Sequence, residues 1–276
     1  KSGMEVVETV FNTDKKAVMD MFEADNVTYP IKAFFGELLE RPRRTKAYPI
    51  ALINKNINLD QLLAINNAMK YPLAYIQGPP GTGKTNTIIN TIVTAFFNNV
   101  TVLFASYNNV PIDNVFEKLS SMKYRGKTIP FPVLRLGNTE KVMEAIKYIN
   151  ELRTQVQSLQ IFASTLDKRK DDRIDRAKRL SARLKEYEEI LDLKERKETL
   201  THLMKYQEHM KNTMKLLPFQ TDLQGYQMQK LDKRIAAIGE ISDTDAMQLL
   251  DRNEDEFYQY LFYTSARYIK ALEDNY

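Results

Sequence analysis

The sequence predicts an α/β protein in which a parallel sheet with helices is followed by an all-α segment of coiled-coil character. Short apolar runs alternate with helical stretches over residues 57–138, which is typical of strands joined by right-handed helical crossovers. Residues 139–276 instead repeat apolar positions at spacings of three and four, which indicates a helical seam. These two patterns divide the chain into a sheet-forming and a helical part.

Composition narrows the class of protein. The 276 residues are 43% hydrophobic, which suffices for a packed core and up to two domains. The chain has no cysteine, so a disulfide framework and a thiolate metal site are excluded. No apolar run approaches the roughly 18 residues of a membrane span, and the N-terminus has no hydrophobic signal region. We therefore expect a cytoplasmic protein.

Positive charge is concentrated in the first half of the chain. Residues 1–138 hold 16 Lys/Arg against 11 Asp/Glu, a net charge of +5, whereas residues 139–276 hold 24 against 25. Two groups carry most of the excess: Arg41, Arg43, Arg44 and Lys46, and then Lys123, Arg125 and Lys127. Such groups fit a nucleic-acid backbone, but ordinary solvated charge accounts for either group as well.

A phosphate-binding loop is the most specific motif. The pattern G-x-x-x-x-G-K-[ST] is matched by Gly78, Pro79, Pro80, Gly81, Thr82, Gly83, Lys84 and Thr85. In such a loop backbone N–H groups surround phosphates, the lysine reaches the β- and γ-phosphates, and the threonine hydroxyl binds Mg²⁺. An apolar run at 73–76 precedes it and a helical stretch at 86–97 follows, so a helix N-terminus faces the anion. We predict ATP and Mg²⁺ as cofactors; a plain glycine turn would not need the lysine.

Other elements follow from the same patterns. Strands are expected at residues 100–105 and 131–136. One helix should start at Asn58 or Asp60 and end before Pro72, and another should start at Pro111 or Asp113. Residues 1–56 are interpreted as a flank, either a linker or the edge of an accessory domain, with a short buried helix near Phe34 and Leu38.

The second half predicts long helices. A heptad seam runs from Val142 to Leu166 and resumes from Ala177 to Leu191, before Pro218 breaks it. A further helix start is expected at residues 242–245. We expect antiparallel helices that form a stalk or small bundle and bury their own seam, or else an exposed coiled coil that engages a partner. His202 and His209 fit a solvated helix face better than a metal site.

The segment 57–61, Ile-Asn-Leu-Asp-Gln, together with the phosphate loop, resembles the superfamily 1B helicases, the group of the nonsense-mediated-decay helicase. The resemblance implies a RecA-like P-loop NTPase domain. It implies that Gln61 reads adenine, because an amide both donates and accepts hydrogen bonds. It also implies that the residues from Gly78 to Asn86 bind ATP, with Lys84 and Thr85 catalytic and Thr85 the metal ligand.

Two further segments resemble motifs of that family. In residues 102–114, Asn109, Asp113 and Asn114 match the family's motif Ia, while Tyr107 replaces the usual proline. Short polar side chains at a strand end suit sugar-phosphate contacts, so Asn108 and Asn109 are predicted to bind nucleic acid. Residues 133–138 resemble an Arg-x-Gly element, after which the family carries a helical insertion. Residues 57–138 would then be the first half of the ATPase domain, and 139–276 the insertion.

The second nucleotide element of such enzymes is missing from the sequence. No run of four apolar residues followed by Asp-Glu occurs after Thr85; its aspartate would complete the Mg²⁺ shell. We therefore expect part of a helicase that acts on single-stranded DNA or RNA together with the remainder of its motor, and no hydrolysis by this part alone. Two alternatives stay open: a nucleotide-binding module whose coiled coil engages a partner, and a non-helicase ATPase with a coiled-coil insertion.

Overall fold

The computed structural model describes residues 16–35, 48–53, 57–161, 163–214, 221–250 and 254–274. The chain divides into two compact units, Lys1–Lys46 with Asn67–Gln77, and Ala47–Asn66 with Gly78–Tyr276. The basic group at residues 41–46 and the break at Pro218 lie outside the described residues. The division into three predicted segments stays a prediction.

The first unit contains helix α2, Tyr29–Phe34, with a proline in its first turn. The helix expected near Phe34 is present, but the expectation that it is buried is wrong, because none of its residues is buried. Phe34 and Phe35 are largely exposed and contact each other edge to face, with 5.4 Å between ring centroids. Leu38, the other half of that expectation, lies outside the described residues.

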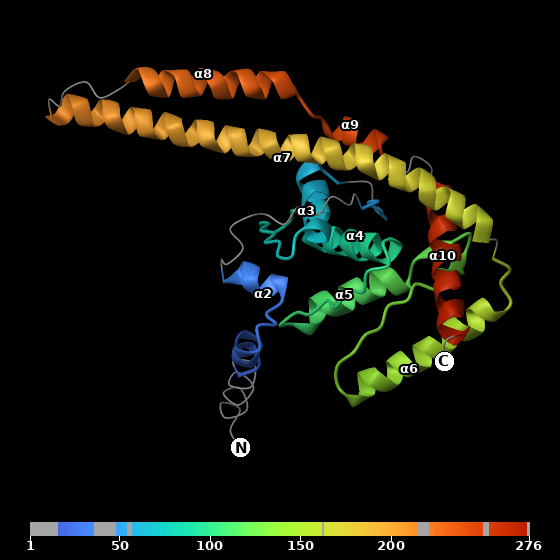
Figure 1. The fold of residues 1–276 in the computed structure, drawn as a ribbon. Helices are drawn as coiled ribbons and strands as arrows, with labels where there is room; N and C mark the ends of the chain where they lie inside the picture. Colours follow the sequence, from blue (N-terminus) through green and yellow to red (C-terminus); the bar gives the residue numbers. More distant parts are fainter. Residues whose placement is uncertain are drawn as a thin grey trace. The chain divides into compact units, whose positions relative to one another are not determined.

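The second unit is built mainly from helices (Figure 1). Helix α3, Leu59–Lys70, contributes residues to both units. The remaining elements are α4 (Lys84–Phe97), α5 (Asn109–Ser120), β1 (Lys123–Tyr124), β2 (Lys127–Thr128), α6 (Thr139–Gln157), α7 (Ala163–Met214), α8 (Thr221–Ile238), α9 (Asp243–Gln248) and α10 (Glu254–Asp274). The helix expected at 86–97 is confirmed, and α5 begins two residues before Pro111. None of the described helices combines the length and apolar character needed to cross a membrane.

The parallel sheet expected in the first half is absent from the described residues. Their one sheet is the antiparallel pair β1–β2, closed by a two-residue turn in which Arg125 and Gly126 both have positive φ. The runs at 73–76, 100–105 and 131–136 form neither helix nor strand, and Leu103 is 88% exposed. An apolar run is consistent with a buried strand, but a strand of a parallel sheet also needs neighbouring strands and helices over both faces.

Polar side chains on one face of α4 bind the backbone of the segment at residues 48–53. Thr94 accepts a hydrogen bond from the Ala51 N–H at 3.1 Å and donates to the Ala51 carbonyl at 3.2 Å. One turn earlier, the Asn90 side-chain oxygen accepts from the Ile53 N–H at 2.9 Å. Residues four apart lie on one helix face, so these side chains replace a neighbouring strand as partners of the segment's backbone.

The expected continuous seam from Val142 to Leu166 is interrupted. Helix α6 ends at Gln157 and α7 begins at Ala163, so two helices replace one. In α6, Leu152 and Val156 pack against Ala266 and Ile269 of α10, whereas Val142 remains 39% exposed. Ala145 is also buried, so the seam of α6 is covered unevenly, and the residues near the C-terminal end of α6 pack on α10.

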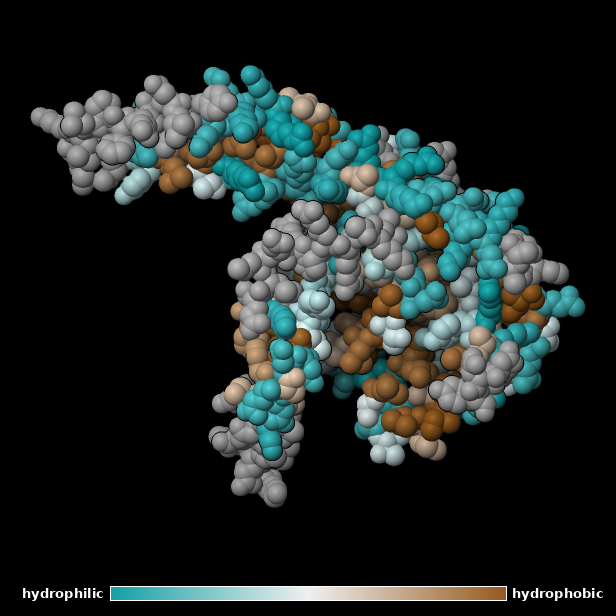
Figure 2. Space-filling view, in the orientation of Figure 1, coloured by the Kyte–Doolittle hydropathy of each residue, from teal (hydrophilic) through white to brown (hydrophobic). Residues whose placement is uncertain are grey.

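Helices α7 and α8 form an antiparallel pair, as expected for a stalk (Figure 1). Ion pairs link them between Glu189 and Arg234 at 2.7 Å and between Lys197 and Asp232 at 2.5 Å. Figure 2 shows hydrophilic side chains over their outer faces. Exposed ion pairs contribute little free energy, so these pairs chiefly fix the register of the two helices.

The other end of α7 belongs to the core of the unit. Leu180 and Leu184 are buried in one cluster with Leu62 and Ile65 of α3 and with Ala246 of α9. A second cluster joins α4, α5, the β1–β2 pair and α10. The helical segment is thus packed on the helix that carries Gln61.

Candidate nucleotide and nucleic-acid sites

The phosphate loop ends at the start of α4. Gly81 and Gly83 have φ of 84° and 78°, a left-handed conformation that glycine adopts without steric cost. Gly83 caps α4 without a side-chain hydrogen bond, and the first turn contains no acidic residue. The first N–H groups of α4 therefore have no side-chain acceptor, and such groups favour a bound anion.

Lys84 curls over its own loop. Its ammonium group donates to the Gly78 carbonyl at 2.6 Å and to the Pro79 carbonyl at 3.3 Å, and the Thr82 hydroxyl donates to the same Pro79 carbonyl at 2.8 Å. These contacts place a cation inside the curve of the loop. Because the Lys84 side chain is exposed, its ammonium group can leave these carbonyl oxygens and donate to the negatively charged oxygens of a phosphate, which are stronger acceptors. The residues present therefore fit a polyphosphate.

The remaining predicted loop residues lie around this curve. Pro80 is exposed, while Thr85 and Asn86 are half-buried in the first turn of α4. No cluster of three or more histidine or acidic residues suited to a metal occurs in the described part of the chain. A divalent cation here would depend on Thr85 and on the phosphates themselves.

Gln61 connects α3 to the loop. Its backbone N–H donates to the Asn58 side chain at 2.9 Å, and its side-chain oxygen accepts from the Asn58 N–H at 3.1 Å. This reciprocal pair is a capping box, and it selects Asn58 as the start of α3. The Gln61 amide nitrogen donates to the Thr82 carbonyl at 2.7 Å. Its role in reading adenine stays a prediction.

Two residues of the helical segment hold the start of α3, and neither was predicted from the sequence. The Asp243 carboxylate accepts a hydrogen bond from the Leu59 N–H at 2.7 Å. The Tyr187 hydroxyl donates to Asp60 at 2.7 Å, and burial together with this carboxylate raises the pKa of Tyr187 to about 12. Sequence separations of 184 and 127 residues left no local signal for either contact.

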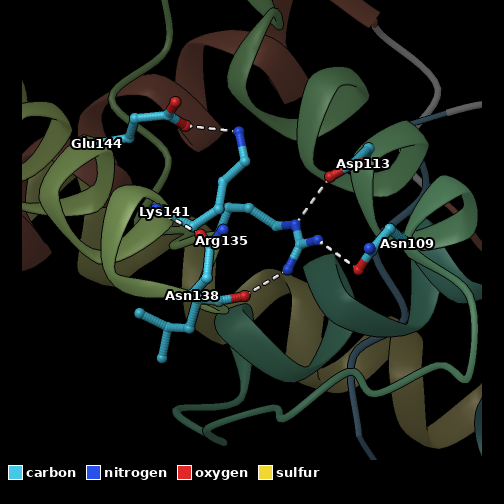
Figure 3. A network of polar contacts seen from close by, with 7 residues as sticks. Asn109, Asp113, Arg135, Asn138, Lys141 and Glu144 are labelled. Atoms are coloured by element: carbon cyan, nitrogen blue, oxygen red, sulfur yellow. Dashed lines mark hydrogen bonds and ion pairs between the residues drawn. The ribbon is translucent and has the colours of Figure 1, made fainter.

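A second polar cluster joins the two segments that resemble motif Ia and the Arg-x-Gly element (Figure 3). The Arg135 guanidinium donates to Asp113 at 2.8 Å, to the Asn109 side-chain oxygen at 3.0 Å and to the Leu136 carbonyl. Its side chain is only 12% exposed. Asn138 caps α6 by accepting from the Lys141 N–H at 3.0 Å. One arginine therefore ties the N-terminal part of α5 to the segment that leads into α6.

The side chains of Asn108 and Asn109 differ in their hydrogen bonding. Asn109 is held by Arg135, whereas Asn108 is exposed and caps α5 without a side-chain hydrogen bond. The first turn of α5 contains no acidic residue. Asn108 therefore keeps its amide available, and the start of α5 is compatible with an anion.

The basic group at residues 123–127 lies on the β1–β2 hairpin. Lys123, Arg125 and Lys127 are all exposed. Arg125 pairs with Asp255 at 3.1 Å, which raises the pKa of the Arg125 guanidinium, and lies 5.2 Å from the Tyr124 ring centroid. His202, on α7, is 3.9 Å from Glu198.

Similarity to known proteins places the chain in a family. A family model described as AAA domain matches residues 56–248. The chain belongs to the AAA domain family. Membership in this family implies that the phosphate loop, which ends at Thr85, binds ATP.

This AAA domain chain is also distantly related to superfamily 1 helicases. It is 34% identical over 101 residues to the DNA-binding protein SMUBP-2 of Mus musculus, covering 36% of this chain and 10% of that protein. It is 32% identical over 98 residues to the DNA polymerase alpha-associated DNA helicase A of Schizosaccharomyces pombe, covering 35% and 14%. With an uncharacterized ATP-dependent helicase of Methanocaldococcus jannaschii it shares 28% identity over 176 residues, covering 61% and 25%. No solved structure matches the chain significantly.

Proposed function

We propose that this AAA domain chain is the ATP-binding part of a nucleic-acid-dependent ATPase of the superfamily 1 helicases. The observation that carries the proposal is the Lys84 ammonium group held inside a glycine loop at the start of α4, 2.6 Å from the Gly78 carbonyl. The chain spans between a tenth and a quarter of the length of the relatives described above. Hydrolysis and unwinding are therefore proposed for the whole protein.

ATP would bring a triphosphate whose γ-phosphoryl group is transferred to water. Lys84 would neutralise the β- and γ-phosphates, and the N–H groups from Gly81 to Thr85 would surround them. Thr85 would bind Mg²⁺ through its hydroxyl. Gln61 would contact the adenine edge with the same amide that donates to the Thr82 carbonyl in this structure. Binding of the base would therefore also affect a contact to the phosphate loop.

Single-stranded DNA is the proposed nucleic acid. Two of the relatives are named for binding or unwinding DNA. In this chain the open start of α5 and the free amide of Asn108 offer donors to phosphate oxygens, and such contacts position a strand without reading its sequence.

We further propose that the unpaired runs at 73–76, 100–105 and 131–136 become strands of a RecA-like sheet when further strands of the whole ATPase domain pair with them. Leu103 is 88% exposed and Leu136 57% exposed, whereas Phe131 at the start of the last run is buried in the core; the exposed positions leave room for further strands. Edge strands with open backbone groups are templates for pairing.

The nucleic-acid part of the proposal can be tested with a fluorescein-labelled oligo(dT) strand and anisotropy. We expect micromolar binding that falls about tenfold in the Asn108→Ala/Asn109→Ala double variant, since hydrogen bonds to charged groups contribute about 1.5–3 kcal/mol. Asn150→Ala, at an exposed position of α6, is the matched control and should bind as the parent does. Absence of binding, or the same loss in the control, would contradict the proposal.

A further inference from the structure

The side-chain amide of Gln61 already uses both of its polar atoms within the protein. Its oxygen accepts from the Asn58 N–H at 3.1 Å, and its nitrogen donates to the Thr82 carbonyl at 2.7 Å. An adenine base would compete with both partners, because an amide contacts the base edge through the same two atoms. Loss of the contact to Asn58 would open the capping box at the start of α3.

Two contacts from the helical segment hold the first turn of α3 independently of that capping box. The Leu59 N–H donates to the Asp243 carboxylate at 2.7 Å, and the Tyr187 hydroxyl donates to Asp60 at 2.7 Å. Burial and the nearby carboxylates of Asp60 and Asp243 raise the pKa of Tyr187 to about 12, so this hydroxyl keeps its proton and remains a donor. Neither contact uses the Gln61 side chain, so both can remain when that side chain turns to a base.

Both contacts come from helices that pack on α3. Tyr187 follows Leu184 by three residues on α7, and Asp243 precedes Ala246 by three residues on α9. Residues three apart share a helix face, and Leu184 and Ala246 are buried in one cluster with Leu62 of α3. The hydrogen-bonding groups are therefore fixed by the core, which lowers the entropy cost of holding α3 for a ligand.

We propose that Tyr187 and Asp243 are positioning residues for recognition of the adenine base, because they keep the first turn of α3 in place while Gln61 binds that base. This inference rests on the proposed function, in which Gln61 contacts adenine and Lys84 contacts the phosphates. Lys84 is held by carbonyl groups of its own loop. Loss of either positioning residue should therefore weaken the contribution of the base and spare that of the phosphates.

The test compares the binding of Mg²⁺-ATP with that of Mg²⁺ and inorganic triphosphate, which lacks the nucleoside, by calorimetry. Tyr187→Phe and Asp243→Ala should each bind ATP roughly threefold to tenfold more weakly than the parent, the size expected for loss of one hydrogen bond. Both variants should bind triphosphate as the parent does. Asp243→Asn keeps an oxygen acceptor for the Leu59 N–H and should recover most of the ATP affinity that Asp243→Ala loses.

The matched controls are Tyr206→Phe on α7 and Thr244→Ala on α9, both at exposed positions, and they should bind both ligands as the parent does. If the parent binds ATP and Tyr187→Phe and Asp243→Ala bind it equally well, the inference is overturned and the proposed function stands. An equal loss of ATP and triphosphate binding in these variants would also overturn the inference, because it would show general damage to the loop. If the parent binds neither ligand, both the inference and the proposed function are overturned.

Discussion

The hydroxyl group of Tyr187 donates a 2.7 Å hydrogen bond to the carboxylate of Asp60. Tyr187 lies on α7, and Asp60 directly precedes Gln61, whose side chain contacts the phosphate loop at Thr82. A contact from the helical segment thus ends one residue away from a contact to the nucleotide loop. The capping of Leu59 by Asp243 adds a second such link.

We expect Tyr187→Phe to lower the free energy of unfolding by about 1–2 kcal/mol, because it leaves Asp60 without its donor while keeping the ring. Urea denaturation followed by circular dichroism measures this change. The control is Tyr206→Phe, at an exposed position of α7, which should be neutral. Equal stability of the two variants would show that the hydrogen bond does not hold α3.

The same tyrosine predicts a pH dependence. Its folded-state pKa is raised to about 12, whereas an unfolded tyrosine titrates near 10. Between these values the unfolded chain has lost the proton that the folded chain retains, so this contribution is complete below about pH 10 and is lost as the pH rises toward 12. Other groups titrate in this range, so the measurement is the difference in unfolding free energy between parent and Tyr187→Phe. That difference should shrink from pH 10 to 12; a constant difference would contradict the assignment.

Gly83 and Gly126 form a matched pair because both have φ of 78°. A Cβ at Gly83 would lie 2.8 Å from the Gln61 amide nitrogen, whereas a Cβ at Gly126 would meet nothing within 4 Å. Both alanine variants should lose about 1–2 kcal/mol of stability from backbone strain. Only Gly83→Ala should also weaken ATP binding, measured by calorimetry. Equal ATP affinity in both variants would mean that the contact between Gln61 and the loop is dispensable.

Arg173 is a buried cation enclosed by aromatic rings. Its guanidinium carbon lies 4.8 Å, 5.1 Å and 5.6 Å from the ring centroids of Phe97, Tyr260 and Phe257. Arg173→Met keeps much of the side-chain volume but removes the charge, and desolvated cation–π contacts contribute about 2 kcal/mol or more. We expect a loss of that size in thermal or urea unfolding. Arg179→Met, at an exposed position of the same helix, should change little; similar losses in both would refute a specific role for the rings.

Local signals in the sequence predicted the local structure well. The glycine pattern and its flanking polarity predicted the loop and the start of α4 near Lys84. Asn58 was one of two predicted starts of α3, and its reciprocal hydrogen bonds with Gln61 select it; the helix start at Asp243 is confirmed. In each case the residues that decide the conformation are neighbours in the sequence.

Features that depend on distant partners were not predicted. The apolar pattern of the runs at 100–105 and 131–136 could not reveal that they lack strand neighbours in the described chain. The sequence presents Arg135 only as part of a motif, because its contacts to Asp113 and Asn109 span sequence separations of 22 and 26 residues. The break between α6 and α7 was missed because the heptad spacing continues across residues that do not form a helix.

The central claim, that Lys84 holds the phosphates of ATP, is tested most directly by isothermal titration calorimetry of Mg²⁺-ATP into the parent chain and into Lys84→Ala. Lys118→Ala, at an exposed lysine of α5, is the control. We predict that the parent and the control bind with equal affinity and that Lys84→Ala binds at least tenfold more weakly, as expected for loss of a charged hydrogen bond of about 1.5–3 kcal/mol. Equal ATP affinity in the parent and Lys84→Ala, or no binding by the parent, would contradict the claim.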